Sequence, residues 1–124
     1  IGFVLRDESR RTGCSPDGLI GAEGLIEIKC PSTAVHLNNA TEGPSLDYRR
    51  QMQFQMYVTG RAWCDFVSWD DRVGDPGLVM SVHQIEKDLE AQLEIDRNIE
   101  WAVKTIDKKV AKLRKVSEKF LKGD

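Results

Sequence analysis

The amino-acid sequence predicts a single α/β domain in which a mixed central β-sheet is flanked by helices. Two observations lead to this fold class. Short segments rich in aliphatic and aromatic residues, typical of strands, lie on both sides of a helical pattern at residues 46–59. The last third of the chain shows an unbroken helical pattern. The expected order is therefore three strands, a helix, two strands and a long C-terminal helix.

The three leading strands are expected before Pro31. Residues 2–7 have the composition of a short strand, and turn or strand-edge sequence follows as far as Gly18. Leu19-Ile20 then runs as the second strand into residues 21–24, which have a glycine at each end and predict a hairpin turn. The turn leads into the third strand, at residues 25–30. Pro31 ends that strand because proline cannot donate to a β-ladder.

The middle of the chain is expected to hold a loop, a helix and two strands. Residues 32–45 are rich in Ser, Thr, Asn and Gly and are predicted to be mostly loop. A helix is predicted over residues 46–59, where Gly60 ends it. Strands are predicted at residues 62–69 and 78–85, separated by a turn rich in Asp and Gly.

The C-terminal helix is predicted over residues 87–121. Its apolar residues recur at intervals of four and three, which places them along one side of a helix. We expect this stripe to face the core or a partner. It comprises Ile99, Val103, Ile106, Val110, Leu113 and Phe120.

Composition restricts the class of protein. A chain of 124 residues with 40% hydrophobic and 31% charged residues fits one soluble, compact domain rather than a disordered segment. No apolar run approaches the roughly 18 residues of a membrane span, so we expect no membrane contact. Three cysteines without a CxxC pair (Cys14, Cys30 and Cys64) indicate a reducing, cytoplasmic setting without disulfides or zinc, and we expect all three to be buried.

Charge is distributed unevenly along the chain. Residues 103–124 hold eight basic and three acidic groups, a sum of +5, whereas the rest holds ten basic and seventeen acidic groups, a sum of −7. The basic segment has two interpretations, contact with a polyanion or the solvated face of a helix. The three tryptophans also have two interpretations, stacking on bases or packing in a core or interface. They are Trp63, Trp69 and Trp101.

A group of charged residues carries the chemistry. In the strand at residues 25–30, Glu27 and Lys29 share one face, and Ile26, Ile28 and Cys30 are expected to point into the core. The preceding hairpin would bring Asp17 alongside Glu27. One interpretation of the acid and the lysine is a surface ion pair, worth about 0–1 kcal/mol. The other is a site in which two carboxylates hold Mg²⁺ and Lys29 assists phosphodiester hydrolysis.

These residues also carry a family resemblance. Pro16-Asp17 followed by Glu27-Ile28-Lys29 resembles the PD-(D/E)xK signature of the restriction-endonuclease-like nuclease superfamily. More narrowly, residues 6–19, 24–31 and 48–59 resemble the lambda-exonuclease and YqaJ-type viral recombinase family. The resemblance implies a restriction-endonuclease-like core: a mixed central sheet flanked by helices.

The resemblance implies a role for each matching residue. Asp17, Glu27 and the backbone carbonyl of Ile28 would ligate the metal. Lys29 would be the catalytic lysine, and Tyr48 would lie near the nucleophilic water or the metal.

On the same grounds, Ser15 and Gln51 would lie near the 5′ phosphate of the DNA. Without the resemblance, Gln51 and Tyr48 would be interpreted as an ordinary helix face.

The activity implied is that of a Mg²⁺-dependent exonuclease, with Mn²⁺ able to substitute. It would degrade the 5′ strand of linear double-stranded DNA in phage-type recombination. The implied partners are double-stranded DNA ends, a ring-shaped homotrimer and a single-strand annealing protein. The implied setting is the cytoplasm of a bacterial host, for a protein of phage or prophage origin. Such nucleases have an N-terminal helical region that nothing here matches, so we expect residues 1–124 to be the nuclease core of a longer protein.

Two other functions stay open at this stage. The same core serves other endonucleases and junction resolvases, which differ in substrate rather than in metal site. A non-catalytic DNA-binding or assembly module is the alternative of a different class.

Overall fold

The computed structural model describes residues 2–123 and has a mixed α/β fold. The chain forms two compact units, Ile1–Gln92 and Leu93–Asp124. The elements of the described residues follow in this order: β1 (Val4–Leu5), β2 (Gly13–Cys14), β3 (Gly18–Ile20), β4 (Gly24–Lys29), α1 (Thr33–Glu42), α2 (Leu46–Thr59), β5 (Trp63–Trp69), the 3₁₀ turn η1 (Pro76–Leu78), β6 (Met80–Glu86) and α3 (Leu89–Leu121).

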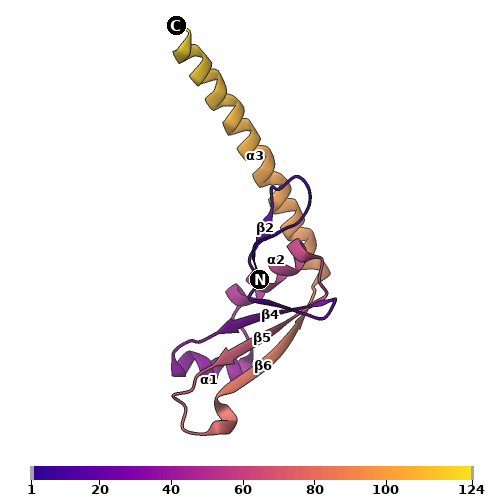
Figure 1. The fold of residues 1–124 in the computed structure, drawn as a ribbon, viewed down its shortest axis with the longest axis vertical. Coiled ribbons are helices and arrows are strands. Elements are labelled where there is room, and N and C mark those ends of the chain that lie inside the picture. The colour runs from indigo at the N-terminus through magenta and orange to yellow at the C-terminus, as the bar shows by residue number, and fades with distance from the viewer. Residues whose placement is uncertain (1, 124) are drawn as a thin grey trace. The chain divides into compact units, whose positions relative to one another are not determined.

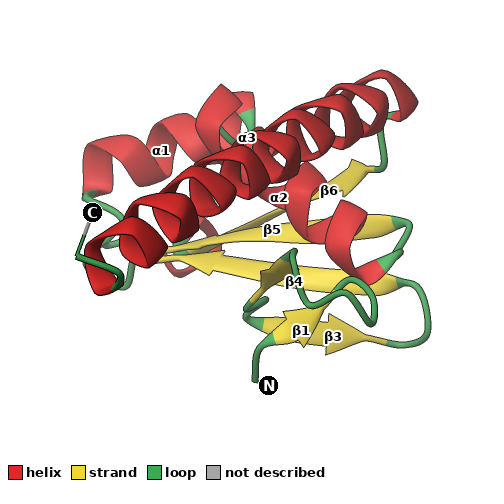
Figure 2. Cartoon of the chain, turned by 90° about the horizontal axis from the view of Figure 1, so that it is seen from above, coloured by secondary structure: helices red, strands yellow, loops and turns green. Residues whose placement is uncertain are grey.

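The main sheet has the strand order β3-β4-β5-β6. Strands β4, β5 and β6 lie side by side in Figure 1, and β3 is labelled in Figure 2. Strands β4 and β5 are parallel, and the other two pairs are antiparallel, which confirms the predicted mixed sheet. A parallel pair needs a crossover connection, and here α1 and α2 supply it. Both helices lie on the same side of the sheet (Figure 2). Strands β1 and β2 form a separate small antiparallel ladder.

The hydrophobic core lies between α2 and the helix-covered face of the sheet. Its fully buried members come from β4, β5 and α2, and Tyr48 and Ile85 pack against them. The core residues are Leu25, Met52, Met56, Cys64 and Phe66. Glu27 follows Leu25 by two residues, so the strand's alternation sends its carboxylate to the same covered side.

This arrangement corrects the predicted orientation of β4. The sequence predicts that Ile26, Ile28 and Cys30 point into the core, but Ile28 is 46% exposed and Cys30 is also exposed. The covered side instead receives Leu25 and Glu27. The aliphatic residues of β4 do not identify its buried face, because the helices cover the face that carries Glu27 and Lys29.

The loop predicted for residues 32–45 is wrong, since α1 occupies most of it. Ser32 caps the helix by accepting a hydrogen bond from the backbone N–H of Val35. Tertiary contacts then hold the helix: the buried His36 bonds Ser68 of β5 through Nδ1 and the Leu78 carbonyl through Nε2, each at 2.7 Å. Helix propensity alone does not indicate this element, because its stabilising partners are distant in sequence.

An acidic residue fixes the entrance to α1. Asp70, at the end of β5, accepts hydrogen bonds from Thr33 and from Arg72, which also donates to the Pro31 carbonyl at 2.8 Å. The bonds from Arg72 and Thr33 lower the pKa of Asp70 to about 2. The turn that follows β4 is therefore tied to the end of the neighbouring strand.

The long helix α3 begins and ends close to the predicted positions. Asp88 accepts hydrogen bonds from the backbone N–H groups of Glu90 and Ala91 at its start. Ile106, Leu113 and Phe120 of the predicted apolar stripe are exposed, so the stripe is not core within the described residues. Within residues 2–123, no helix is both long and apolar enough to cross a membrane.

Thiol reactivity tests the burial of the three cysteines. Burial raises the pKa of the Cys14 thiol, and burial together with the negative charges of Glu27 and Asp65 raises the pKa of Cys64 to about 12. Cys30 is exposed, contrary to the sequence-based expectation. At mildly alkaline pH, Ellman's reagent should therefore label Cys30 rapidly, and Cys14 and Cys64 only after unfolding, because thiolate is the reactive form. Rapid labelling that persists in Cys30→Ser would contradict the fold described.

Candidate active site

The two carboxylates predicted to act together lie at the junction of β3 and β4. Gly18 of β3 pairs with Ile26 of β4. Because the two strands are antiparallel, extending this register by one residue places Asp17 opposite Glu27. Asp17 Oδ2 accepts a hydrogen bond from the backbone N–H of Ile28 at 2.8 Å. This bond fixes the Asp17 side chain beside the Glu27–Ile28 peptide, as the predicted hairpin requires.

Glu27 is the most constrained member of the cluster, with only 3% of its surface exposed. Three donors surround its carboxylate. Oε1 accepts from Lys29 Nζ at 2.9 Å and from Gln51 Nε2 at 3.0 Å. Oε2 accepts from Gln55 Nε2 at 3.0 Å. A carboxylate with so little contact with water needs such donors, because burying an unpaired charge is strongly unfavourable.

Helix α2 supplies both amides by its periodicity. Gln51 and Gln55 are four residues apart and therefore lie on one side of the helix, above Glu27. The helix position is fixed at both ends: Ser45 accepts from the Tyr48 N–H, and Gly60 takes the left-handed conformation with φ of 73°. Met52 and Met56 bury the adjacent side of the helix in the core.

Lys29 and Tyr48 complete the cluster. The Lys29 ammonium lies 4.9 Å from the centroid of the Tyr48 ring, and that ring packs against Phe66. Burial opposes the charged form of Lys29, but the hydrogen bond to Glu27 and the nearby charges of Glu27 and Asp17 raise its pKa. Lys29 is therefore held as a cation beside two carboxylates.

The structure thus brings together Asp17, Glu27, Lys29, Tyr48 and Gln51, all of which the sequence singles out. Ser15 is exposed and, within residues 2–123, makes no hydrogen bond to these residues.

Sequence reasoning missed Gln55. The signal is present, because Gln55 lies one helical turn beyond Gln51 in the run Gln51-Met52-Gln53-Phe54-Gln55. Its carbonyl oxygen Oε1 is buried and has no hydrogen-bond partner among the described residues. Gln53 serves another purpose, since it bonds the Glu86 carbonyl and the Asp88 N–H and so holds α2 to the start of α3.

The donor set fits a hard divalent cation in its chemistry. Asp17 and Glu27 offer carboxylate oxygens, and the Ile28 carbonyl lies on the same peptide segment. Mg²⁺ prefers oxygen ligands and is usually held by one or two carboxylates with several waters. Within the described part of the chain, no group of three or more His, Cys, Asp or Glu side chains gathers in a metal-binding arrangement. The residues present therefore suit a sparsely ligated, hydrated ion better than zinc.

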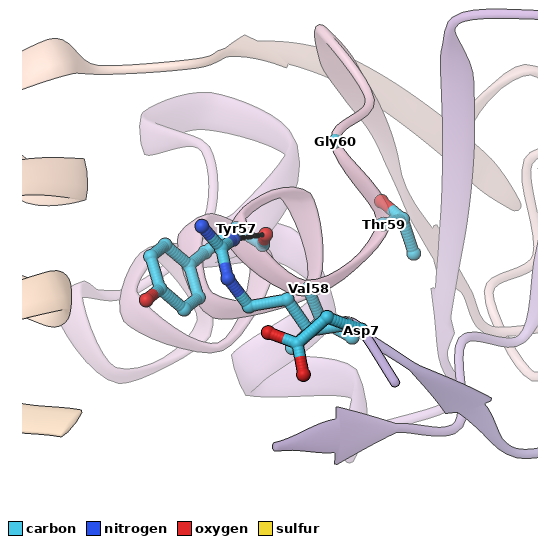
Figure 3. A pocket seen from close by; sticks show the side chains of 6 residues that line it. Asp7, Tyr57, Val58, Thr59 and Gly60 are labelled. Carbon is cyan, nitrogen blue, oxygen red and sulfur yellow. Dashed lines mark hydrogen bonds between the residues drawn. The ribbon is translucent and has the colours of Figure 1, made fainter. Parts of the chain in front are cut away.

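A hollow elsewhere on the molecule has a different character. It is lined by Arg6, Asp7, Tyr57, Val58, Thr59 and Gly60, and so involves none of the clustered residues (Figure 3). The Arg6 guanidinium stacks 3.7 Å from the Tyr57 ring centroid and donates to the Tyr57 carbonyl. These contacts attach the β1 segment to the end of α2.

Comparison with known proteins agrees with the architecture. The model of the YqaJ-like viral recombinase domain matches residues 1–62. The chain is 40% identical to an alkaline exonuclease (LHK-Exo) from Laribacter hongkongensis, and the match has a TM-score of 0.69 and covers 91% of this chain. A second structure of LHK-Exo, in complex with dAMP, gives a TM-score of 0.72 at the same identity and coverage. The chain spans 62% of the length of that exonuclease. No curated protein matches it.

Removing Gln55 tests the support of Glu27. Gln55→Ala leaves the buried Oε2 atom of Glu27 without its donor, which should lower the free energy of unfolding by about 1–3 kcal/mol. Gln84→Ala is the matched control, because Gln84 donates to Asp65 at 3.2 Å in an exposed pair. That substitution should change stability by at most about 0.5 kcal/mol. Urea denaturation of both variants gives the comparison, and equal losses would mean that Gln55 does not support Glu27.

Proposed function

The chain belongs to the YqaJ-like viral recombinase domain family, and from that premise we propose that it is the core of a metal-dependent DNA exonuclease acting in phage-type recombination. The observation that carries the proposal is the cluster in which Glu27, buried and bonded by Lys29, Gln51 and Gln55, lies beside Asp17. The 40% identity to an alkaline exonuclease over 91% of the chain supports it.

In the proposed reaction, Asp17, Glu27 and the Ile28 carbonyl hold Mg²⁺, for which Mn²⁺ can substitute. When bound, such an ion polarises the scissile phosphate and lowers the pKa of an attacking water. Gln51 and Gln55 hold Glu27 in one orientation. Lys29, kept charged by its neighbours, stabilises the negative charge that builds on the phosphate oxygens. Tyr48 limits the positions that the Lys29 ammonium can take.

The proposed substrate is the end of linear double-stranded DNA, degraded from the 5′ terminus. Ser15 and Gln51 are the proposed contacts of the 5′ phosphate. The complex of LHK-Exo with dAMP, a mononucleotide, is compatible with a relative that releases nucleotides. We further propose a homotrimeric ring around the DNA, a single-strand annealing protein as partner, and action in the cytoplasm of a bacterial host.

Digestion of a labelled duplex tests activity and polarity together. A linear duplex with one 5′-phosphorylated, labelled end should be shortened from that end in Mg²⁺ and not in EDTA. Lys29→Ala should lower the rate by at least about 100-fold, as expected when one positioned charge that stabilises the transition state is removed.

Lys87→Ala is the control, because Lys87 is a lysine that lies outside the cluster and bonds a backbone carbonyl, that of Gly60. Cutting of circular DNA at a similar rate would indicate an endonuclease or a resolvase. No cutting of either DNA in Mg²⁺ or Mn²⁺, by this chain or by any longer natural form, would overturn the nuclease proposal and favour a DNA-binding or assembly module.

Metal binding can be measured without catalysis. Calorimetric titration with Mn²⁺ should give a binding isotherm that Asp17→Asn weakens and Glu27→Ala abolishes, because each variant removes a carboxylate ligand. Glu23→Ala removes an exposed carboxylate of the same hairpin and should leave the isotherm unchanged. Asp17 is exposed, so its variant is expected to fold even if Glu27→Ala does not. Unchanged binding in Asp17→Asn would reject the assigned ligands.

A further inference from the structure

Between residues 97 and 119, one face of α3 carries only cations and a tryptophan. With 100° of rotation per residue, Arg97, Lys104, Lys108, Lys112, Lys115 and Lys119 fall within an arc of about 80°. We call these six residues the basic face. Between residues 97 and 119, the arc holds one further residue, Trp101, and no acidic residue. At 1.5 Å per residue, the face runs for about 33 Å along the helix.

Trp101 does not belong to the apolar stripe of α3. It is 69% exposed and lies about 100° or more around the helix from the stripe residues Ile106, Leu113 and Phe120. The stripe and the basic face occupy opposite sides of the helix. The large apolar ring of Trp101 is therefore placed among cations and in solvent, where packing against the stripe does not account for it.

We propose that the basic face and Trp101 bind single-stranded nucleic acid. Lysine and arginine side chains in a row neutralise successive phosphates of a strand, and an aromatic ring among them stacks on an unpaired base. Both requirements are met within Leu93–Asp124, without help from any other part of the chain. Lys104 already pairs with Glu100 at 3.0 Å, but both side chains are exposed and such pairs are weak, so a phosphate can replace Glu100.

Other polyanions fit the arrangement less well. Duplex DNA offers phosphates to the lysines but keeps its bases stacked on each other, which leaves Trp101 without a base to stack on. An anionic membrane surface would favour a tryptophan on the apolar side of the helix, where it could enter the lipid. Here Trp101 lies on the basic side, so the unpaired strand is the better match.

The surface extends the proposed function without depending on it. If the nuclease proposal holds, removing one strand of a duplex leaves the complementary strand single, and the basic face is suited to hold that product. Strand binding itself needs no metal and no cleavage. Strand binding measured in EDTA is therefore independent of cleavage. Lys29→Ala should lose cleavage and keep strand binding. A variant of the basic face that loses strand binding would leave the nuclease proposal unaffected.

The test is fluorescence anisotropy of a labelled dT oligonucleotide in EDTA with the whole chain. Lys108→Glu/Lys112→Glu reverses two members of the basic face. Lys109→Glu/Arg114→Glu makes the same change in net charge on the same helix but outside the arc. The first variant should bind at least about tenfold more weakly than the second. Its slope of log affinity against log salt concentration should fall by about 0.7 for each phosphate that is no longer neutralised.

Trp101 provides a second, independent readout. Oligonucleotide binding should quench tryptophan fluorescence in the parent chain, and Trp101→Phe should lose most of that quenching while circular dichroism stays unchanged. Trp101→Ala should weaken binding of the oligonucleotide more than binding of a blunt duplex. Equal losses in the two charge-reversal variants, equal affinity for duplex and single strand, or binding to anionic vesicles in place of the oligonucleotide would each overturn the proposal.

Discussion

The architecture of the first unit depends on the burial of one carboxylate. Glu27 lies among core residues with 3% of its surface exposed, a position that is unfavourable for a charge without strong hydrogen bonds. Two amides and an ammonium provide those bonds. Because both amides come from α2, this helix has to cross the sheet over β4 at one rotation and one height. The crossover that joins two parallel strands is therefore also the element that makes the buried charge tolerable.

This requirement explains an unusual feature of α2. Its buried residues include Gln53 and Gln55 besides Met52 and Met56, so polar and apolar groups share the side that packs on the protein. Gln51 and Gln55 bond the carboxylate, and Gln53 holds the strand end and the start of α3. The helix gains specificity of position from these bonds, since a rotation of one residue would separate the amides from Glu27.

Much of the first unit could be predicted where signals are local. The bounds of β4 and α2 follow from Pro31 and Gly60, and the hairpin that places Asp17 follows from its glycines. Helix α1 could not be predicted in this way, because His36 and Asn39 are stabilised by Ser68 of a strand that comes later in the chain. The prediction for the orientation of β4 failed for a related reason. Aliphatic content indicates Ile26 and Ile28 as the core face, but the covering helix carries donors as well as apolar groups and therefore lies over Glu27. Gln55 was missed although it lies one helical turn beyond Gln51, because that spacing does not by itself show that both amides face a buried carboxylate.

The hydrogen bonds at Glu27 also indicate where the cluster has capacity left. A carboxylate oxygen has about two acceptor positions. Within residues 2–123, Oε1 uses both, for Lys29 and Gln51, whereas Oε2 accepts from Gln55 alone. Among the clustered side chains, two carboxylates face a single ammonium, so one negative charge is left uncompensated beside a buried group. A cluster built only for stability would gain from neutralising that charge or from replacing it with apolar residues. An uncompensated charge with a free acceptor position is instead what the binding of a cation requires, and for this reason we interpret the cluster as a site rather than as a structural ion pair.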